Sequence, residues 1–247
     1  MGEDRLIVPA ETSVLCESCG YTLDGLPTTG QCPECGAPIA QSTTSDGRIL
    51  PAWEDITPEN GRVWKFFTTT ITVLIHTSRF YRTLATRTQT QAAFQFARIH
   101  WALSAFFFAG ALAIHAYWYE RFLLGPQIPG GPWLIWLAAF PLTYLFLWGT
   151  TSLAARLSAW EAAYWGMRLP LPVVLRSMYY HAAHYEPVAI LAFATVAGNY
   201  VLIKTRWISE ASAQRYLIVL CAQVLISAAY LFKTYWTGMK GVRYANR

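Results

Sequence analysis

The sequence predicts a mostly α protein: a multi-pass α-helical membrane bundle of about four spans with a small N-terminal four-cysteine zinc-ribbon module. Two observations carry this prediction. Two C-x2-C pairs occur within the first forty residues, and long apolar runs follow from about residue 100. The chain is 54% hydrophobic and only 13% charged, whereas about a quarter of the residues in soluble domains are charged.

The two cysteine pairs indicate one metal site. Twelve residues separate the pairs, and a glycine follows each of them. A C-x2-C turn aims two thiolates at one point, and two such turns are typical of a tetrahedral site. Because a closed shell of four thiolates suits structural zinc, we predict a zinc ribbon over residues 1–50. The predicted ligands are Cys16, Cys19, Cys32 and Cys35.

Iron is the main competitor of zinc for this site. The half-motifs CxxCGY and CPECG also resemble those of rubredoxin-like domains, in which four thiolates hold an iron that carries one electron. Such sites usually pack several aromatic rings around the metal, but Tyr21 is the only aromatic residue between Met1 and Trp53. Two disulfides, or four free thiols, would also account for these cysteines. The fifth cysteine, Cys221, lies in an apolar run and is expected to act as a small apolar residue.

The charge and size of the ribbon constrain its role. Residues 1–50 carry seven acidic and two basic side chains, a net charge of −5. Binding nucleic acid requires a basic surface, so we expect no nucleic-acid partner. The segment is too small to bury a core of its own, so metal binding is expected to drive its folding. Because no secretory signal opens the chain, the ribbon is expected in the cytosol, where thiols stay reduced.

Four stretches are long enough to cross about 30 Å of hydrocarbon as helices. They are Trp101–Tyr119, Trp133–Leu153, Pro187–Ile203 and Tyr216–Phe232. Basic residues gather before the first stretch, between the second and third, and after the fourth, which predicts that both termini are cytoplasmic. Three bases in the last outer loop, Lys204, Arg206 and Arg215, oppose this orientation. The expected organisation is a body over 101–233 and a cytoplasmic tail over 234–247.

Residues 51–100 are expected to hold an interfacial amphipathic helix and a juxtamembrane region. Thr57-Pro58-Glu59 predicts a helix start, and the helix is expected to extend to about residue 85. It would place apolar side chains on one side, with bases and threonines largely on another; a basic amphipathic helix of this kind lies among the lipid headgroups. Packing against the membrane bundle is the alternative. The apolar side comprises Trp64, Phe67, Ile71, Leu74 and Ile75.

Two longer patterns carry a family resemblance. The segment Ser78-Arg79-Phe80-Tyr81-Arg82, followed by two spans and by LPVVLRSMYYHAAHYEPVAIL at residues 171–191, resembles the Yip family of multi-pass membrane proteins over about residues 58–233. That family typically has five spans, whereas four are expected here. The ribbon pattern CxxCGY…LxGLP…CPECG with such a body also resembles a group of bacterial membrane proteins of unknown function. The resemblance implies a location in the bacterial cytoplasmic (inner) membrane.

The sequence carries few features of an enzyme or a transporter. No Asp, Glu, Lys or Arg lies in the middle of a predicted span, and no phosphate-binding, serine-hydrolase or zinc-protease motif occurs. His181, His184 and Glu186 share a helix face, which suggests either a second metal site or polar residues at the membrane interface. His115, inside the first span, is expected to bond to a neighbouring helix.

We therefore predict a non-enzymatic membrane scaffold or complex subunit with a cytosolic zinc-ribbon docking module. Its expected partners are the lipid bilayer and a protein or larger membrane complex. A redox accessory protein with an iron site is the second hypothesis for the function, and a small-molecule transporter is a third, less favoured one.

Overall fold

The computed structural model describes residues 13–43, 48–55, 61–86, 89–119, 131–165, 167, 169–205, 207 and 213–246. Within these ranges the chain is mostly helical and forms no sheet, only isolated β-bridges. The expected helix start at Thr57–Glu59 and most of the loop between the first two spans lie outside the described residues.

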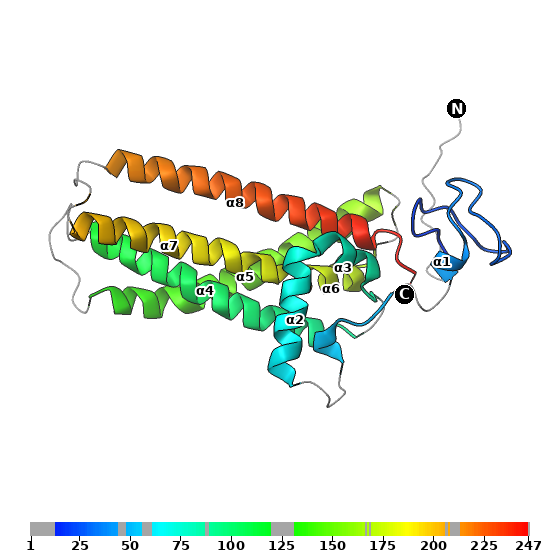
Figure 1. Cartoon of the computed structure of the whole chain (residues 1–247), viewed down its shortest axis with the longest axis horizontal. Helices are drawn as coiled ribbons and strands as arrows, with labels where there is room; N and C mark the ends of the chain where they lie inside the picture. Colours follow the sequence, from blue (N-terminus) through cyan, green and yellow to red (C-terminus); the bar gives the residue numbers. More distant parts are fainter. Residues whose placement is uncertain are drawn as a thin grey trace. The chain divides into compact units, whose positions relative to one another are not determined.

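The helices are shown in Figure 1. In chain order they are α1 (Ala40–Thr43), η2 (Ala52–Glu54), α2 (Arg62–Ile75), α3 (Thr77–Thr83), α4 (Gln91–Tyr119), α5 (Gly131–Tyr164), α6 (Leu171–His181), η4 (Ala182–His184), α7 (Tyr185–Lys204) and α8 (Ala213–Val242).

The predicted fold class is confirmed. Among the described residues, four apolar helical stretches are long enough to cross a membrane, and they indicate a membrane protein. Each extends beyond the apolar run from which it was predicted. Arg98 and Lys233, for example, lie inside α4 and α8, because arginine and lysine are good helix formers and do not end a helix. The stretches are Gln91–Trp118, Trp133–Tyr164, Leu171–Lys204 and Arg215–Val242.

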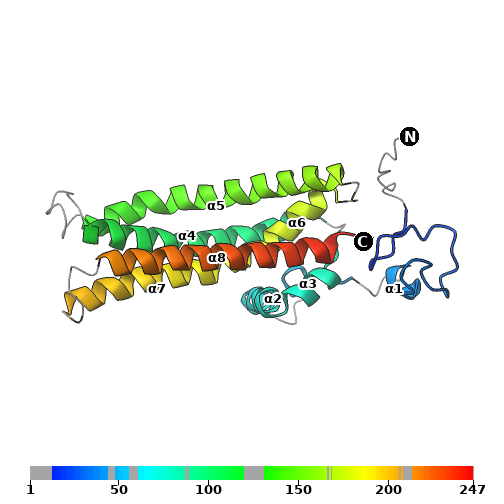
Figure 2. The same cartoon turned by 90° about the horizontal axis from the view of Figure 1, so that it is seen from above.

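The chain forms two compact units. The first unit comprises Met1–Ala97, Thr151–His181 and Thr234–Arg247, and the second comprises Arg98–Thr150 and Ala182–Lys233. The second unit contains the larger parts of α4, α5 and α8 together with all of α7, and these segments run alongside one another (Figures 1 and 2).

Close packing between helices defines the interior of the second unit. A Cβ atom at Gly110 of α4 would lie only 2.9 Å from the ring of Phe193 of α7. The Trp136 indole of α5 donates to the carbonyl oxygen of Phe106 over 3.2 Å. On the outside, Leu142 and Ile226 are more than half exposed, as are many other large apolar side chains of these helices. Apolar surface of this extent suits contact with lipid.

The first unit is built around a chain of aromatic rings. Trp53 of η2 contacts Phe66 of α2, which contacts Phe96 of α4, and the ring centroids lie 5.8 and 5.3 Å apart. The Phe96 ring lies 5.1 Å from that of Tyr180 on α6, which in turn contacts Phe80 of α3. Such ring pairs add to the free energy of burial. They join four helices and η2 into one core.

A buried ion pair lies next to these rings. The guanidinium group of Arg176, whose side chain is fully buried, lies 2.7 Å from the Glu54 carboxylate. Arg176 also donates to the carbonyl oxygens of Ala85 and Gln89, over 2.7 and 2.9 Å, and the Tyr180 hydroxyl donates to Glu54. The contacts of Arg176 therefore hold η2, Ala85 and Gln89 against α6.

The expected single helix over residues 57–85 is wrong in one respect. The helix is broken at His76, which leaves helical geometry (φ −112°, ψ 38°) and separates α2 from α3. Hydroxyls of Thr70, Thr72 and Thr77 donate to carbonyl oxygens four residues earlier. Side-chain bonds of this kind compete with the helical ladder and bend helices, which explains the break.

Removal of one partner of the buried ion pair should destabilise the first unit strongly. Arg176→Met leaves the Glu54 carboxylate buried without its counter-charge, and such a loss costs about 3–5 kcal/mol. Thermal unfolding of the purified protein should show a clearly lower melting temperature. Glu161→Gln, at an exposed position of α5, is the control and should leave the transition unchanged. Equal melting of the two variants would contradict the role given to Arg176.

Candidate metal centre

Two turns of nearly identical geometry carry the four cysteines. In the first knuckle, residues 16–21, the Gly20 N–H donates to Cys16 O and the Cys16 N–H donates to Tyr21 O, both over 2.8 Å. In the second knuckle, residues 32–37, the same two bonds join Gly36 to Cys32 and Cys32 to Ala37, again over 2.8 Å. The glycines have φ of +86° and +72°, and this left-handed region favours glycine.

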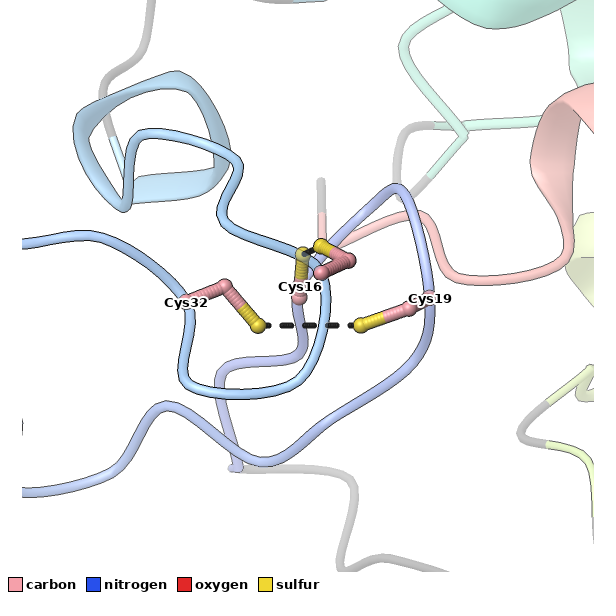
Figure 3. Close-up of side chains that lie close together, drawn as sticks. Cys16, Cys19 and Cys32 are labelled. Carbon is pink, nitrogen blue, oxygen red and sulfur yellow. Dashed lines mark hydrogen bonds between the residues drawn. The ribbon is translucent and has the colours of Figure 1, made fainter.

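The knuckles bring all four sulfurs together, as the sequence predicts. Every pair of sulfurs lies within 4.8 Å. The sulfurs of Cys19 and Cys32, which point toward each other in Figure 3, lie 3.6 Å apart, as do those of Cys16 and Cys35. Four sulfurs placed about 2.3 Å from a common tetrahedral centre would lie about 3.8 Å apart. The arrangement therefore fits a metal ion.

The cysteines are free thiols, so the interpretation as two disulfides is wrong. Sulfur atoms 3.6 Å apart are far beyond the S–S bond length of about 2.05 Å. Each of these two separations joins a sulfur of one knuckle to a sulfur of the other.

The protein core around this cluster is small. Leu23 and Ile39 are the large apolar side chains buried beside Cys16 and Cys32. Two such side chains contribute about 3–6 kcal/mol on burial, far less than the cost of ordering some thirty residues. A bound metal ion and contacts with the rest of the first unit must supply the difference.

The two thiols of the cluster that are not fully buried, Cys19 and Cys35, differ in acidity. The backbone N–H of Ala37 lowers the pKa of the Cys35 thiol to about 7. Burial raises the pKa of the Cys19 thiol to about 12. A metal ion replaces these protons, since the thiolate is the ligand. Cys35 can therefore offer a thiolate to an incoming ion near neutral pH, and Cys19 loses its proton when the ion binds.

The C-terminal tail covers the first knuckle. The Asn246 side chain accepts from Leu15 N over 2.8 Å and donates to Leu15 O and Ser42 O over 2.7 and 2.9 Å. Its backbone N–H donates to the Glu17 carboxylate. The Tyr244 ring lies so close to Gly20 that a Cβ there would be 2.6 Å from it. We call these contacts of Tyr244 and Asn246 the tail clasp.

Arg48 strengthens the attachment of the ribbon. Its Nε donates to Glu17 over 2.8 Å. Its terminal nitrogens donate to the carbonyl oxygens of Leu84 and Gly241 over 3.0 and 3.1 Å. The guanidinium group thus links the first knuckle, the end of α3 and the end of α8. Ile49 beside it pairs with Leu84 in a parallel β-bridge.

The second knuckle is open to solvent. Pro33, Cys35 and Gly36 are exposed, whereas Glu17, Cys19 and Gly20 at the equivalent positions of the first knuckle are half-buried; Cys16 and Cys32 are both buried. The cysteine cluster is therefore asymmetric: the first knuckle is held by the rest of the first unit, and the second knuckle is exposed.

The second metal site suggested by the sequence finds no support among the described residues. There, the four cysteines form the only group of three or more potential ligands. His181 bonds to Thr234, 3.0 Å away, and His184 to Tyr230, 2.8 Å away. Glu186 lies 2.8 Å from His100. The expected helix-to-helix bond of His115 is confirmed, with Tyr216 of α8 as its partner at 2.8 Å.

Several important residues were missed by the sequence analysis. Asn246 and Tyr244 stand in a polar tail with no motif around them, so nothing in the sequence pairs them with a segment 231 residues away. Arg176 was counted among the bases at the membrane surface, yet it is fully buried. Its place in an apolar helix beside two tyrosines was the available signal, because a lone charge there needs a buried partner.

Comparisons with known proteins add no relative: no family model, no curated protein and no solved structure matches the chain. The resemblance to the Yip family therefore stays an expectation based on the sequence patterns alone.

Loss of one cysteine should release the metal. In Cys32→Ser, the hydroxyl is a much poorer ligand than a thiolate, so metal content should fall to near zero and residues 13–43 should become sensitive to protease. Metal analysis and limited proteolysis of the purified protein measure both effects. Cys221→Ser is the matched control, because this exposed cysteine of α8 lies outside the cluster. Full metal retention in Cys32→Ser would contradict the site.

Loss of the tail clasp should loosen the ribbon while the ligands stay in place. Asn246→Ala removes the three bonds of the side chain, each worth on the order of 1 kcal/mol. We expect a chelator to extract the metal faster and protease to cut the ribbon sooner. Asn199→Ala, in α7, is the control. An unchanged extraction rate in Asn246→Ala would show that the clasp does not stabilise the ribbon.

Proposed function

We propose that the chain is a non-enzymatic integral membrane scaffold, or a subunit of a larger membrane complex, with a zinc ribbon as its docking module. The observation that carries this proposal is the asymmetry of the cysteine cluster. One knuckle is tied to the ends of α3 and α8 through Arg48 and the tail clasp, while the other is exposed. A ribbon held in this way is suited to presenting a rigid surface to a partner.

The chemistry of the exposed knuckle indicates the kind of partner. Glu34 and Asp24 are both exposed, and residues 1–50 carry a net charge of −5. A basic protein surface complements this charge, and such complementarity favours fast and specific association. Nucleic acid has the same sign of charge as the ribbon and is not proposed as a partner.

Zinc is the proposed metal, because a closed shell of four thiolates suits a structural zinc ion. One observation favours a redox role with iron instead. Tyr244 supplies an aromatic ring at the first knuckle, in addition to Tyr21, and rubredoxin-like sites usually have several such rings. A small-molecule transporter is less favoured, since no charged residue lies in the middle of the apolar runs Trp101–Tyr119, Trp133–Leu153, Pro187–Ile203 and Tyr216–Phe232.

The proposed location is the bacterial cytoplasmic membrane, with both termini in the cytoplasm. The distribution of basic residues and the resemblance to Yip-like and bacterial ribbon proteins support it. A cysteine placed at Thr205, between α7 and α8, should then react with an impermeant reagent added outside intact cells. Labelling only after the cells are opened would show that the orientation is opposite to the proposed one.

Two measurements on the full-length protein test the function. Metal analysis with an absorption spectrum should give zinc and no colour. An iron–thiolate chromophore would instead favour a role in electron transfer over the docking role. A photo-crosslinking residue at Glu34 should then yield a discrete adduct with another protein in cells. The same residue at Thr28, also exposed but outside the knuckles, should not, and Cys32→Ser should abolish the adduct. No adduct at position 34 would overturn the docking role.

A further inference from the structure

Helix α2 is inverted relative to an ordinary surface helix. Its polar side chains Lys65, Thr69 and Thr70 are buried, with exposed fractions of 6%, 2% and 8%. Phe66 and Val73 share this buried side, but the other large apolar side chains of α2 are mostly exposed. In a water-soluble protein the opposite arrangement is expected, since the apolar stripe normally faces the core. We call the outward side the apolar face of α2; its members are Val63, Trp64, Phe67, Ile71 and Ile75, each more than half exposed.

Specific bonds hold α2 in this orientation. The Lys65 ammonium donates to the backbone oxygen of Asp55 over 2.7 Å and pairs with its carboxylate at 3.3 Å. The Thr69 hydroxyl accepts from the backbone N–H of Trp53 over 2.9 Å. Rotation of the helix would break these bonds and leave the polar groups unsatisfied, at about 1–3 kcal/mol each. The outward apolar face is therefore fixed by the fold.

The surroundings of α2 indicate a bilayer as the solvent for this face. Phe66 contacts Phe96, and Arg62 donates to Gln95 over 2.9 Å. Both partners belong to the first turns of α4, in the stretch that can cross the membrane. Helix α2 therefore packs against the beginning of a candidate membrane span. With 14 residues, α2 is about 21 Å long and too short to cross the hydrocarbon itself.

The charges near α2 select the type of lipid. No acidic residue occurs between Asn60 and Tyr119. Arg79 and Arg82 of α3, directly after α2, are exposed. Two other bases are engaged within the protein: Lys65 pairs with Asp55, and the Arg62 guanidinium lies over the Trp53 ring, 4.9 Å from its centroid. Arg82 donates to the backbone oxygen and hydroxyl of Ser78, one turn earlier on α3, over 3.3 and 3.1 Å. These acceptors are neutral, so the charges of the exposed Arg79 and Arg82 can attract anionic headgroups.

We propose that the apolar face of α2 lies among the lipid headgroups, parallel to the membrane, and that Arg79 and Arg82 bind the phosphates of anionic lipids there. Trp64 suits this position, since tryptophan prefers the interface between hydrocarbon and water. The two arginines each enrich anionic lipid about fivefold, the equivalent of about 1 kcal/mol per base, and salt weakens the effect.

Fluorescence quenching on the full-length protein tests the position of α2. A fluorescent non-natural residue replaces Ile71, and the protein is reconstituted in phosphatidylcholine nanodiscs, with or without phosphatidylglycerol. Lipids brominated near the headgroup should quench this probe strongly, and aqueous acrylamide should quench it weakly. A probe at the exposed position Thr28 should show the reverse. Quenching of the Ile71 probe by acrylamide alone, or by neither reagent because another protein covers it, would overturn the proposal.

A second arm tests the choice of lipid. Phosphatidylglycerol should increase quenching of the Ile71 probe by lipid, and high salt or the double variant Arg79→Gln/Arg82→Gln should abolish the increase. Arg62→Gln is the matched control and should preserve it, because Arg62 is already held by Trp53 and Gln95. Lipid quenching that is unchanged by phosphatidylglycerol, or an increase that survives both high salt and the double variant, would refute the role of the two arginines.

Discussion

The buried charge of Arg176 is the constraint on which the rest of the first unit depends. A guanidinium group without water is tolerated only when every donor finds a partner, and here Glu54 and two backbone carbonyls fill that role. These partners lie in η2 and in residues 85–89, so the ion pair fixes both segments against α6. η2 in turn holds Lys65 and Thr69 through Asp55 and Trp53. The inverted orientation of α2 thus follows, step by step, from the need to satisfy one buried charge.

The ribbon shows how a segment without a core of its own joins a larger structure. Its large buried apolar side chains are Leu23 and Ile39 beside the cysteines and Leu15 before the first knuckle, so it depends on contacts from outside its own residues. Arg48 and Asn246 supply them as hydrogen bonds to backbone and to Glu17. Glu17 lies in the first knuckle and Leu15 directly before it, whereas Ser42, which also bonds to Asn246, belongs to α1. The outer residues of the second knuckle, 33–36, stay exposed.

The parts of the structure that local sequence determines were predictable. The C-x2-C spacing sets each knuckle within six residues, and apolar runs reveal the long helices, so both were expected from the sequence alone. Contacts over long separations were not. Asn246 carries no pattern that links it to Leu15, and the break at His76 depends on threonine side-chain bonds that compete with the helix. The orientation of α2 was predicted in outline, as one apolar and one polar side. Which side meets protein depends on Asp55 and Trp53, which precede the helix and belong to another element.

Arg48 connects the first knuckle of the ribbon with the ends of α3 and α8. Its guanidinium group contacts Glu17 beside the first knuckle and, at the same time, the carbonyl oxygens of Leu84 and Gly241 at the ends of α3 and α8. If the first knuckle unfolds on loss of metal, Glu17 leaves and the Arg48 charge, only 5% exposed, loses its counter-ion. A buried charge in that state is costly, so Arg48 must move toward water and release the two carbonyl groups. The state of the metal site is therefore coupled to the end of α3 through Arg48, and to the end of α8 through both Arg48 and the tail clasp.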